Sequence, residues 1–199
     1  MSSSTGYLKV IIGPMTSGKT TKALNEAIVK AINHSVLYVT FKGSNDRAVE
    51  GGDTHNFTSH NSLLKVLPGS IFCFCTLELS TVDVSEYDVI LVDESNFYQD
   101  LVVSVMKWLS MNKYIIVVGL DGDYKQEKFG QVLDLIPICD DVKKISAECS
   151  LCKTEYGLSH LSHSIKGVPA PFSKRNVKSD EIELIGGTDI YTAVCRKHL

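Results

Sequence analysis

The sequence has no long apolar run and no excess of positive charge. None of its hydrophobic stretches approaches the roughly 20 residues that a membrane-spanning helix needs. The apolar run in MSSSTGYLKVII is not preceded by the basic residues of a secretory signal. The net charge is −3 and the isoelectric point is about 6.1, whereas a large nucleic-acid-binding surface needs a basic excess. We therefore expect a cytoplasmic protein that binds neither a membrane nor nucleic acid.

The chain is too short for several large domains, and no internal repeat is visible. Its 199 residues suit one substantial domain with a small appendage. Apolar residues make up 44% and charged residues 22%, as in an ordinary globular protein. Because the chain is expected inside the cell, its six cysteines indicate reduced thiols or metal ligands rather than a disulfide framework.

Short apolar runs alternate with helix-like segments up to about Leu120. The spacing of apolar residues predicts helices from Thr20 to about Ile32 and from Leu101 to Met111. The apolar runs are nearly continuous, which is typical of parallel strands covered on both faces. We expect a doubly wound α/β domain over residues 1–143, with ligands beyond the carboxyl ends of the strands. The expected strands are Leu8–Ile12, Val36–Thr40, Ile71–Phe74, Val89–Val92 and Ile115–Val118.

The character of the sequence changes after Lys143. Residues 144–199 contain paired cysteines, few helical patterns and a Gly186-Gly187 turn. This composition predicts a small C-terminal unit with little apolar core of its own. Such a unit usually needs a cross-link or a bound metal to be stable.

The segment GPMTSGKT, after the first expected strand, matches the phosphate-binding pattern G-x-x-x-x-G-K-T. Its glycines let backbone N–H groups turn toward phosphates, Lys19 brings a positive charge to the terminal phosphates, and Thr20 offers a hydroxyl to Mg²⁺. The alternative is a chance match in a turn, but the motif stands between a strand and a helix, as it requires. The predicted ATP- and phosphate-binding residues here are Gly13, Pro14, Met15, Thr16, Ser17, Gly18, Lys19 and Thr20.

The strand in YDVILVDESNFY ends in two acids, Asp93 and Glu94. An acid at this point lies beside the phosphate loop in phosphate-binding α/β folds, so Asp93 and Thr20 are the predicted magnesium ligands. Glu94 is then placed to accept a proton from the group that attacks the γ-phosphate. The alternative is a pair of acids at a helix start. The accompanying phosphate loop favours nucleotide chemistry.

Four aromatic residues are expected near the carboxyl ends of the strands: Phe97, Tyr98, Tyr124 and Phe129. Aromatic walls suit a flat, neutral ring such as a nucleobase. For any one of them, ordinary core packing is the favoured alternative. Their joint position after the strands is what indicates a base-binding pocket.

Two ligand pairs, Cys149-x-x-Cys152 and Cys195-x-x-His198, have the spacing of a tetrahedral structural Zn²⁺ site. Four ligands close such a site, so its role would be to tie the C-terminal unit together rather than to catalyse. The alternative is unligated thiols beside a histidine. Cys73, Cys75 and Cys139 have no partner motif, and the first two are expected to be packing residues.

The sequence resembles the type II thymidine kinases of animals, bacteria and poxviruses. GPMTSGKT, VDESNFY, LDGDYKQEKFG, FSKR and IELIGGTDIYTAVCRKH carry the resemblance and span nearly the whole chain in the family's order. The resemblance implies a RecA-like P-loop NTPase fold with a small zinc-binding lasso domain. It implies transfer of the γ-phosphate of ATP to the 5′-hydroxyl of thymidine, giving dTMP, and also to deoxyuridine. It further implies dTTP as a feedback inhibitor and a homotetramer.

The same resemblance implies roles for single residues. Glu94 matches the general base of the family. The segment Phe172–Leu184 resembles the lasso loop, which lies over the thymine and closes on it, excluding water. The positions expected to line the nucleoside pocket are Met15, Phe97, Leu120, Tyr124, Phe129, Ser173, Ile182, Leu184 and Tyr191.

One departure from the family is an insertion around residues 153–171, where the usual connection is much shorter. It carries His160 and His163 at helical spacing. A solvated loop is the preferred interpretation, and a weak metal site is the alternative. The insertion bears on how the lasso closes.

Other departures lie near the expected active site. The family has an Asp-x-Arg pair after the second strand, and the nearest match is Asn45-Asp46-Arg47, from which Arg47 is expected to reach phosphate. Asn96 stands where the family often has glutamine, and Tyr124 where it often has phenylalanine. An extra hydroxyl beside the base could alter base preference.

Two other functions stay open at this point. A RecA-like ATPase acting on nucleic acid would share the phosphate loop and the acidic strand end, but it needs a basic surface that the charge balance does not offer. A non-catalytic nucleotide-binding or zinc-dependent interaction module is the second alternative. The presence of Lys19, Thr20, Asp93 and Glu94 argues against it.

Overall fold

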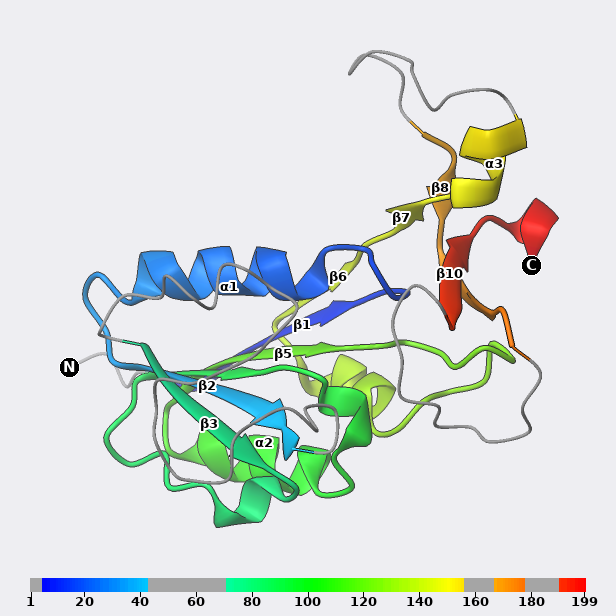
Figure 1. Cartoon of the computed structure of the whole chain (residues 1–199). Helices are drawn as coiled ribbons and strands as arrows, with labels where there is room; N and C mark the ends of the chain where they lie inside the picture. The colour runs from blue at the N-terminus through cyan, green and yellow to red at the C-terminus, as the bar shows by residue number, and fades with distance from the viewer. Residues whose placement is uncertain (1–4, 43–70, 156–166, 178–189) are drawn as a thin grey trace.

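The structure is a computed structural model that describes residues 5–42, 71–155, 167–177 and 190–199. A six-stranded sheet has helix α1 on one face and helix α2 on the other, and a smaller C-terminal unit lies beside it (Figure 1). The strands and α-helices are β1 Tyr7–Ile12, α1 Lys19–Lys30, β2 Val36–Phe41, β3 Ile71–Thr76, β4 Val89–Val92, α2 Leu101–Ser110, β5 Tyr114–Gly119, β6 Asp141–Lys144, β7 Ala147–Glu148, α3 Ser150–Glu155, β8 Pro169–Ala170, β9 Phe172–Arg175 and β10 Tyr191–Val194. Short 3₁₀ helices are η3 Leu79–Thr81, η4 Ser95–Phe97, η5 Val132–Ile138 and η7 Arg196–His198.

All strands of the large sheet run parallel, in the order β3-β2-β4-β5-β1-β6. Every residue of β4 is buried, because helices cover both faces of the sheet. The five predicted strands and the two predicted helices are all present, with ends within two residues of those expected. The doubly wound parallel α/β fold is therefore confirmed.

The sequence does not predict strand β6. Its residues, DVKK, are mostly exposed and lack the apolar pattern of the other strands. β6 lies at the edge of the sheet and pairs with β1 from Lys9↔Asp141 to Ile12↔Lys144. Backbone pairing at an edge requires no apolar side chains, and charged residues there discourage pairing with another chain.

Two apolar layers hold the helices against the sheet. Ala23, Leu24 and Ala27 of α1 are fully buried against one face, and their helical spacing explains why this segment forms an amphipathic helix. Val105 and Trp108 of α2 are buried against the other face. Each large side chain buried in this way stabilises the fold by about 1.5–3 kcal/mol. Within the described ranges, no helix is long and apolar enough to cross a membrane.

The parallel strands bring three sequence motifs together at the carboxyl ends of the strands. The phosphate loop follows β1, the acidic pair follows β4 and the LDGDY segment follows β5. β5 pairs in parallel register with both β1 and β4, so the three carboxyl ends lie side by side. The three motifs that the sequence analysis linked to ligand binding therefore lie next to one another in the fold.

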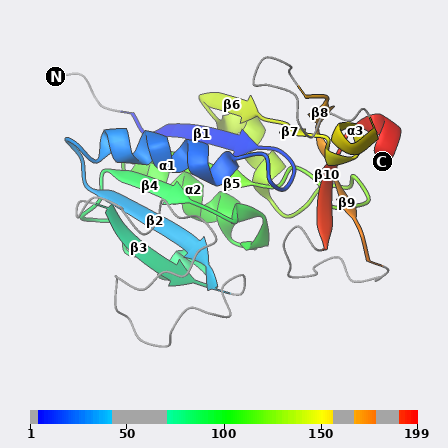
Figure 2. The same ribbon diagram turned by 45° about the horizontal axis from the view of Figure 1, so that its top comes forward.

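The C-terminal unit lies beside these carboxyl ends of the strands (Figure 2). It consists of α3 and two antiparallel strand pairs, β7 with β8 and β9 with β10. Its core is small and half of its buried members are cysteines, in agreement with the expectation of a unit with little apolar core. The division of the chain into residues 1–143 and 144–199 stays a prediction. The buried members are Cys149, Cys152, Ala170, Ala193, Val194 and Cys195.

We predict that Gly130→Ala destabilises the protein more than Gly18→Ala. Both glycines have a positive φ, of +63° and +82°, and an alanine in this left-handed conformation costs about 1–2 kcal/mol. A Cβ on Gly130 would also lie 2.1 Å from the backbone oxygen of Asn96, whereas a Cβ on Gly18 meets nothing within 4 Å among the described residues. Denaturant unfolding measures both losses, and equal losses would contradict the close approach at Gly130.

Candidate functional site

The phosphate loop joins β1 to α1, and two of its side chains form hydrogen bonds to its own backbone. Ser17 Oγ and Lys19 Nζ both donate hydrogen bonds to the carbonyl oxygen of Pro14, at 2.9 Å and 2.6 Å. A Cβ on Gly13 would lie 2.1 Å from the carbonyl oxygen of Ile145, so only glycine fits against the segment after β6. The loop leads directly into the positive end of α1, which favours an anion.

Lys19 lies within electrostatic reach of the acids that follow β4 and β5. Burial lowers the pKa of its ammonium group, while attraction to Glu94, Asp93 and Asp121 opposes that shift. A phosphate-binding lysine beside a metal-binding carboxylate is the arrangement that phosphoryl transfer uses. Lys19 therefore has surroundings that fit its predicted role.

Asp93 is a buried carboxylate, 5% exposed, directly after β4. It accepts hydrogen bonds from Thr20 Oγ1 at 3.1 Å, from the Tyr38 hydroxyl at 2.9 Å and from the Glu94 backbone N–H at 2.9 Å. Burial raises the pKa of Asp93, and these three donors oppose the shift. Thr20 and Asp93 are thus in direct contact and offer the oxygen ligands that Mg²⁺ prefers. Magnesium binding by this pair stays a prediction.

Sequence reasoning missed Tyr38. In the run VLYVT it counts as one more apolar strand residue, and its ring is indeed buried, at 3% exposure. Burial and the neighbouring Asp93 raise the pKa of Tyr38 well above its ordinary value, so its hydroxyl stays a donor. A phenol in a strand covered on both faces needs a polar partner. That requirement is the signal that could have found it.

Glu94 has a strained backbone and a strongly shifted carboxyl group. Its φ of +52° is in the left-handed region, which costs a non-glycine residue energy and is often found at functional sites. Burial, together with repulsion from Asp93, raises the pKa of Glu94 to about 7, against the attraction of Lys19. A carboxylate with a pKa near neutral pH is suited to accept and release a proton.

Two hydrogen bonds fix the segments after β4 and β5 to each other. Ser95 Oγ donates to the Val118 carbonyl oxygen at 2.7 Å, and the Leu120 N–H donates to Asn96 Oδ1 at 3.1 Å. Asn96, one of the departures from the family pattern, is 1% exposed and so acts as a buried link. The acidic pair and the LDGDY segment therefore keep a fixed spacing.

The predicted aromatic residues fall into two groups. The Phe97 ring stacks on Phe41 at 5.2 Å between centroids and meets Phe129 edge-on at 5.5 Å. Tyr98 is fully buried, so the packing alternative holds for it. Tyr124 contacts the guanidinium of Arg175, whose central carbon lies 3.7 Å from the centroid of its ring. Contact of Phe97, Phe129 and Tyr124 with a nucleoside stays a prediction.

The C-terminal unit contacts the phosphate loop through Ser173. This buried residue of β9 accepts a hydrogen bond on its Oγ from the Met15 backbone N–H at 3.1 Å. Tyr191 of β10 is 9% exposed and accepts a hydrogen bond from Arg175. The structure thus brings Met15, Ser173, Tyr124 and Tyr191 to the junction between the sheet and the C-terminal unit.

Three predicted site residues, Arg47, Ile182 and Leu184, lie outside the described residues. The same holds for His160 and His163 of the insertion. Their predicted roles stay predictions.

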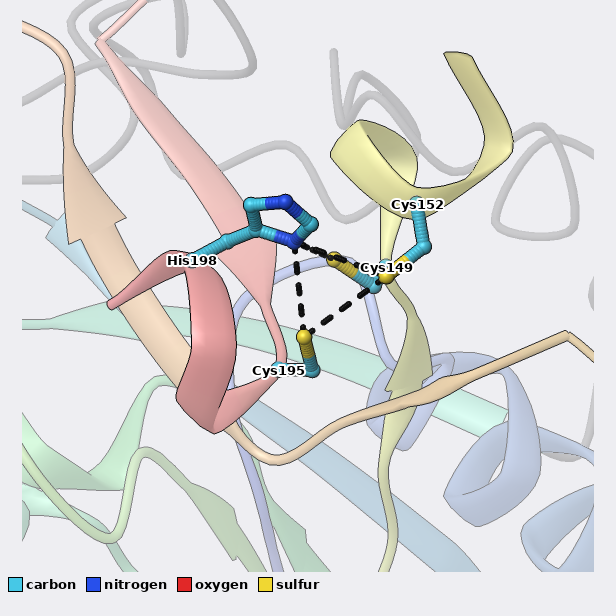
Figure 3. A group of neighbouring side chains, drawn as sticks. All are labelled: Cys149, Cys152, Cys195 and His198. Carbon is cyan, nitrogen blue, oxygen red and sulfur yellow. Dashed lines mark hydrogen bonds between the residues drawn. The ribbon is translucent and has the colours of Figure 1, made fainter. Parts of the chain in front are cut away.

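The four predicted zinc ligands converge, although they come from two distant segments (Figure 3). Their ligand atoms all lie within 4.8 Å of one another. His198 Nδ1 is 3.5 Å from the sulfur of Cys149, 3.5 Å from that of Cys152 and 3.4 Å from that of Cys195, and the last two sulfurs are 3.7 Å apart. Tetrahedral zinc with ordinary bond lengths gives ligand separations of about 3.6–3.8 Å. The cluster could therefore hold zinc.

Glu155 provides a second layer around this cluster that the sequence did not indicate. Its Oε2 lies 3.2 Å from His198 Nε2, on the opposite side of the ring from Nδ1. A carboxylate at this point keeps a proton on Nε2 and leaves Nδ1 to bind a metal. Cys73 and Cys139 lie elsewhere and pack against the apolar layers of the sheet, as expected for Cys73.

Comparison with known proteins identifies the family. The family model described as thymidine kinase matches residues 6–199. The chain belongs to the thymidine kinase family. The thymidine kinase of Oryza sativa subsp. japonica is 36% identical over 203 residues, which cover 97% of this chain and 66% of that protein. The thymidine kinase of vaccinia virus, strain Western Reserve, is 34% identical over 196 residues and 96% of each chain.

Among solved structures, the flagellar accessory protein FlaH from Methanocaldococcus jannaschii aligns with a TM-score of 0.42 at 20% identity, over 67% of this chain and 68% of its own. The resemblance inferred from the sequence motifs is confirmed by the family and its relatives. These findings support the function of a thymidine kinase, which is a phosphotransferase. The nucleic-acid-dependent ATPase receives no better support from them.

We predict that Glu94→Gln stabilises the nucleotide-free protein more as pH rises. Folding raises the pKa of Glu94 from 4.5 to about 7, so the folded state binds the extra proton between these values. Wild-type stability therefore falls as pH increases through this window, and the full cost is present above pH 7. Glutamine has no charge to bury. Guanidinium unfolding without Mg²⁺ at several pH values measures the difference, and a pH-independent difference would contradict the shift.

Proposed function

We propose that the chain transfers the γ-phosphate of ATP to the 5′-hydroxyl of thymidine, and of deoxyuridine, and so supplies dTMP for DNA synthesis. The observation that most directly supports this is the hydrogen bond from Thr20 of the phosphate loop to Asp93, which precedes Glu94 in the sequence. The chain also belongs to the thymidine kinase family. A phosphate loop, an acid for the metal and a base are the parts that phosphoryl transfer needs.

In this proposal Glu94 is the general base. Its carboxylate takes the proton of the 5′-hydroxyl as that oxygen attacks the γ-phosphorus. The bond from the γ-phosphorus to the β–γ bridging oxygen breaks, and ADP leaves with the electron pair. Lys19 and the N–H groups of the phosphate loop, Gly13–Thr20, hold the phosphates and neutralise the charge that spreads over the transferring group.

Thr20 and Asp93 are the residues that would hold Mg²⁺, since a hydroxyl and a carboxylate fit its preference for oxygen. When bound there, Mg²⁺ would supply positive charge that offsets the negative charge of the phosphates. The Tyr38 hydroxyl holds one oxygen of Asp93 and so fixes how the carboxylate faces the loop. Arg47 is proposed as a further phosphate ligand.

The nucleoside is proposed to bind where the C-terminal unit meets the carboxyl ends of the strands. There the lasso segment Phe172–Leu184 would cover the base and exclude water, which competes with the sugar hydroxyl for the phosphoryl group. The Ser173 contact to Met15 supports this position. The pocket residues proposed are Met15, Phe97, Leu120, Tyr124, Phe129, Ser173, Ile182, Leu184 and Tyr191.

Cys149, Cys152, Cys195 and His198 are proposed to hold one structural Zn²⁺. Three sulfurs and one imidazole nitrogen, all within 4.8 Å of one another, fit this metal. All four positions are protein ligands, so the metal would stabilise the unit that carries the lasso and take no part in chemistry. By resemblance to the family we also propose feedback inhibition by dTTP, a homotetramer and a cytoplasmic location.

We predict that the purified protein with Mg·ATP phosphorylates thymidine and deoxyuridine but not purine nucleosides. Glu94→Gln should lower kcat by about 10²–10⁴-fold, because the hydroxyl loses its general base. Glu127→Gln, which changes an exposed acid after β5, is the matched control and should leave kcat unchanged. A panel of deoxy- and ribonucleosides assayed for ADP release measures both. ATP hydrolysis that requires DNA and ignores thymidine would favour the nucleic-acid-dependent ATPase instead.

We predict about one Zn²⁺ per chain in the purified protein. Cys152→Ser should lose the metal and lower the melting temperature by several degrees, because metal binding contributes directly to the stability of a small unit. Cys139→Ser is the control, since Cys139 packs on the sheet away from the cluster. Elemental analysis and thermal unfolding check this. Folded protein without zinc, at the same melting temperature, would refute the site.

A further inference from the structure

Arg175, the last residue of β9, contacts two aromatic residues from different parts of the chain. Its guanidinium carbon lies 3.7 Å from the ring centroid of Tyr124, in the segment after β5. Its Nη2 donates a hydrogen bond to the Tyr191 hydroxyl at 2.8 Å. Tyr191 is also the direct register partner of Arg175 across the β9–β10 pair. One side chain therefore ties the C-terminal unit to a strand-end loop of the main sheet.

The contact with Tyr124 occupies one face of that ring. With its guanidinium carbon 3.7 Å from the ring centroid, Arg175 makes a close cation–π contact and leaves no room for a base on the same face. Any partner of Tyr124 must then use its other face or its edge. The hydrogen bond to the Tyr191 hydroxyl in turn limits the positions that the guanidinium can take.

The direction of Arg175 follows from the alternation of side chains along β9. Ser173 and Arg175 are two residues apart and share one side, where Ser173 meets the phosphate loop at Met15. Lys174 points the other way and donates to the His198 carbonyl oxygen at 2.7 Å. One side of β9 thus carries Arg175, which contacts Tyr124. The other side of β9 is held beside the Cys/His cluster by Lys174.

We propose that Arg175 is a specificity-determining positioning residue, which sets Tyr124 and Tyr191 as two walls of the nucleoside pocket. The inference rests on the proposed thymidine kinase reaction and deepens it by naming the residue that orients these walls. Arg175 acts through the two rings and has no part in phosphate binding. Losing it should weaken nucleoside binding and leave the phosphate side of the reaction intact.

The test compares steady-state constants of Arg175→Ala, Arg175→Lys and wild type. We expect Arg175→Ala to raise the KM for thymidine by on the order of tenfold, with kcat and the KM for ATP changed less than about twofold. Arg175→Lys keeps a cation over the ring but loses the planar fork, so it should recover only part of the affinity. Lys125→Ala is the matched control: Lys125 Nζ lies 5.5 Å from the same ring, is exposed, and should not matter.

A second arm asks whether Arg175 acts through the ring of Tyr124. In a Tyr124→Leu background the effect of Arg175→Ala should be smaller than in the wild type, because only its contact with Tyr191 is left to lose. Tyr124→Phe keeps the ring and should retain the full effect. Tyr191→Phe removes a single hydroxyl oxygen, leaves folding intact, and should raise the thymidine KM on its own if Arg175→Ala does not fold.

The outcomes separate this inference from the proposed reaction. Wild-type turnover of thymidine tests the reaction itself. If the wild type is active but Arg175→Ala raises the KM for ATP instead, the arginine serves the phosphates and the inference is overturned. Equal effects of Arg175→Ala in the wild-type and Tyr124→Leu backgrounds, or an unchanged thymidine KM in Tyr191→Phe and Arg175→Lys alike, would overturn it as well.

Discussion

The candidate site depends on one buried carboxylate, that of Asp93. A charge at this depth is tolerated only when donors surround it, and Thr20, Tyr38 and the Glu94 amide supply three. These donors come from the start of α1, from β2 and from the turn after β4. Three parts of the fold therefore meet at one group, and the phosphate loop can be correctly placed only when the strand order is correct. Folding of the sheet therefore also brings together the residues of the candidate site.

Local sequence signals were sufficient for the frame of the site. The phosphate loop, the acidic strand end and the two cysteine motifs each consist of a few neighbouring residues whose spacing carries the chemistry. Strand β6 has no such signal because edge pairing uses the backbone, and DVKK has the composition of a loop. The roles of Tyr38 and Arg175 could not be predicted from the sequence for another reason. Their partners, Asp93, Tyr124 and Tyr191, are 55, 51 and 16 residues away, and only the folded chain brings them together.

The C-terminal unit has a very small apolar core. Half of its six buried core residues are cysteines, which contribute less apolar area than leucine or isoleucine would. Convergence of Cys149, Cys152, Cys195 and His198 places the ligand cluster where a larger domain would have its core. β9 runs along this cluster, with Lys174 on one side and Ser173 on the other. The same strand therefore contacts both the segment of the Cys/His cluster and the phosphate loop.

Asp93 and Glu94 are neighbours in the sequence with opposite surroundings. Asp93 accepts three hydrogen bonds, whereas no described residue donates one to the Glu94 side chain. Burial raises the pKa of both carboxyl groups. Three hydrogen-bond donors and Lys19 oppose the shift at Asp93, whereas Lys19 alone opposes it at Glu94. Two adjacent carboxyl groups in different environments can divide the tasks of a site, and the different partners of Asp93 and Glu94 fit the proposed division into metal ligand and base.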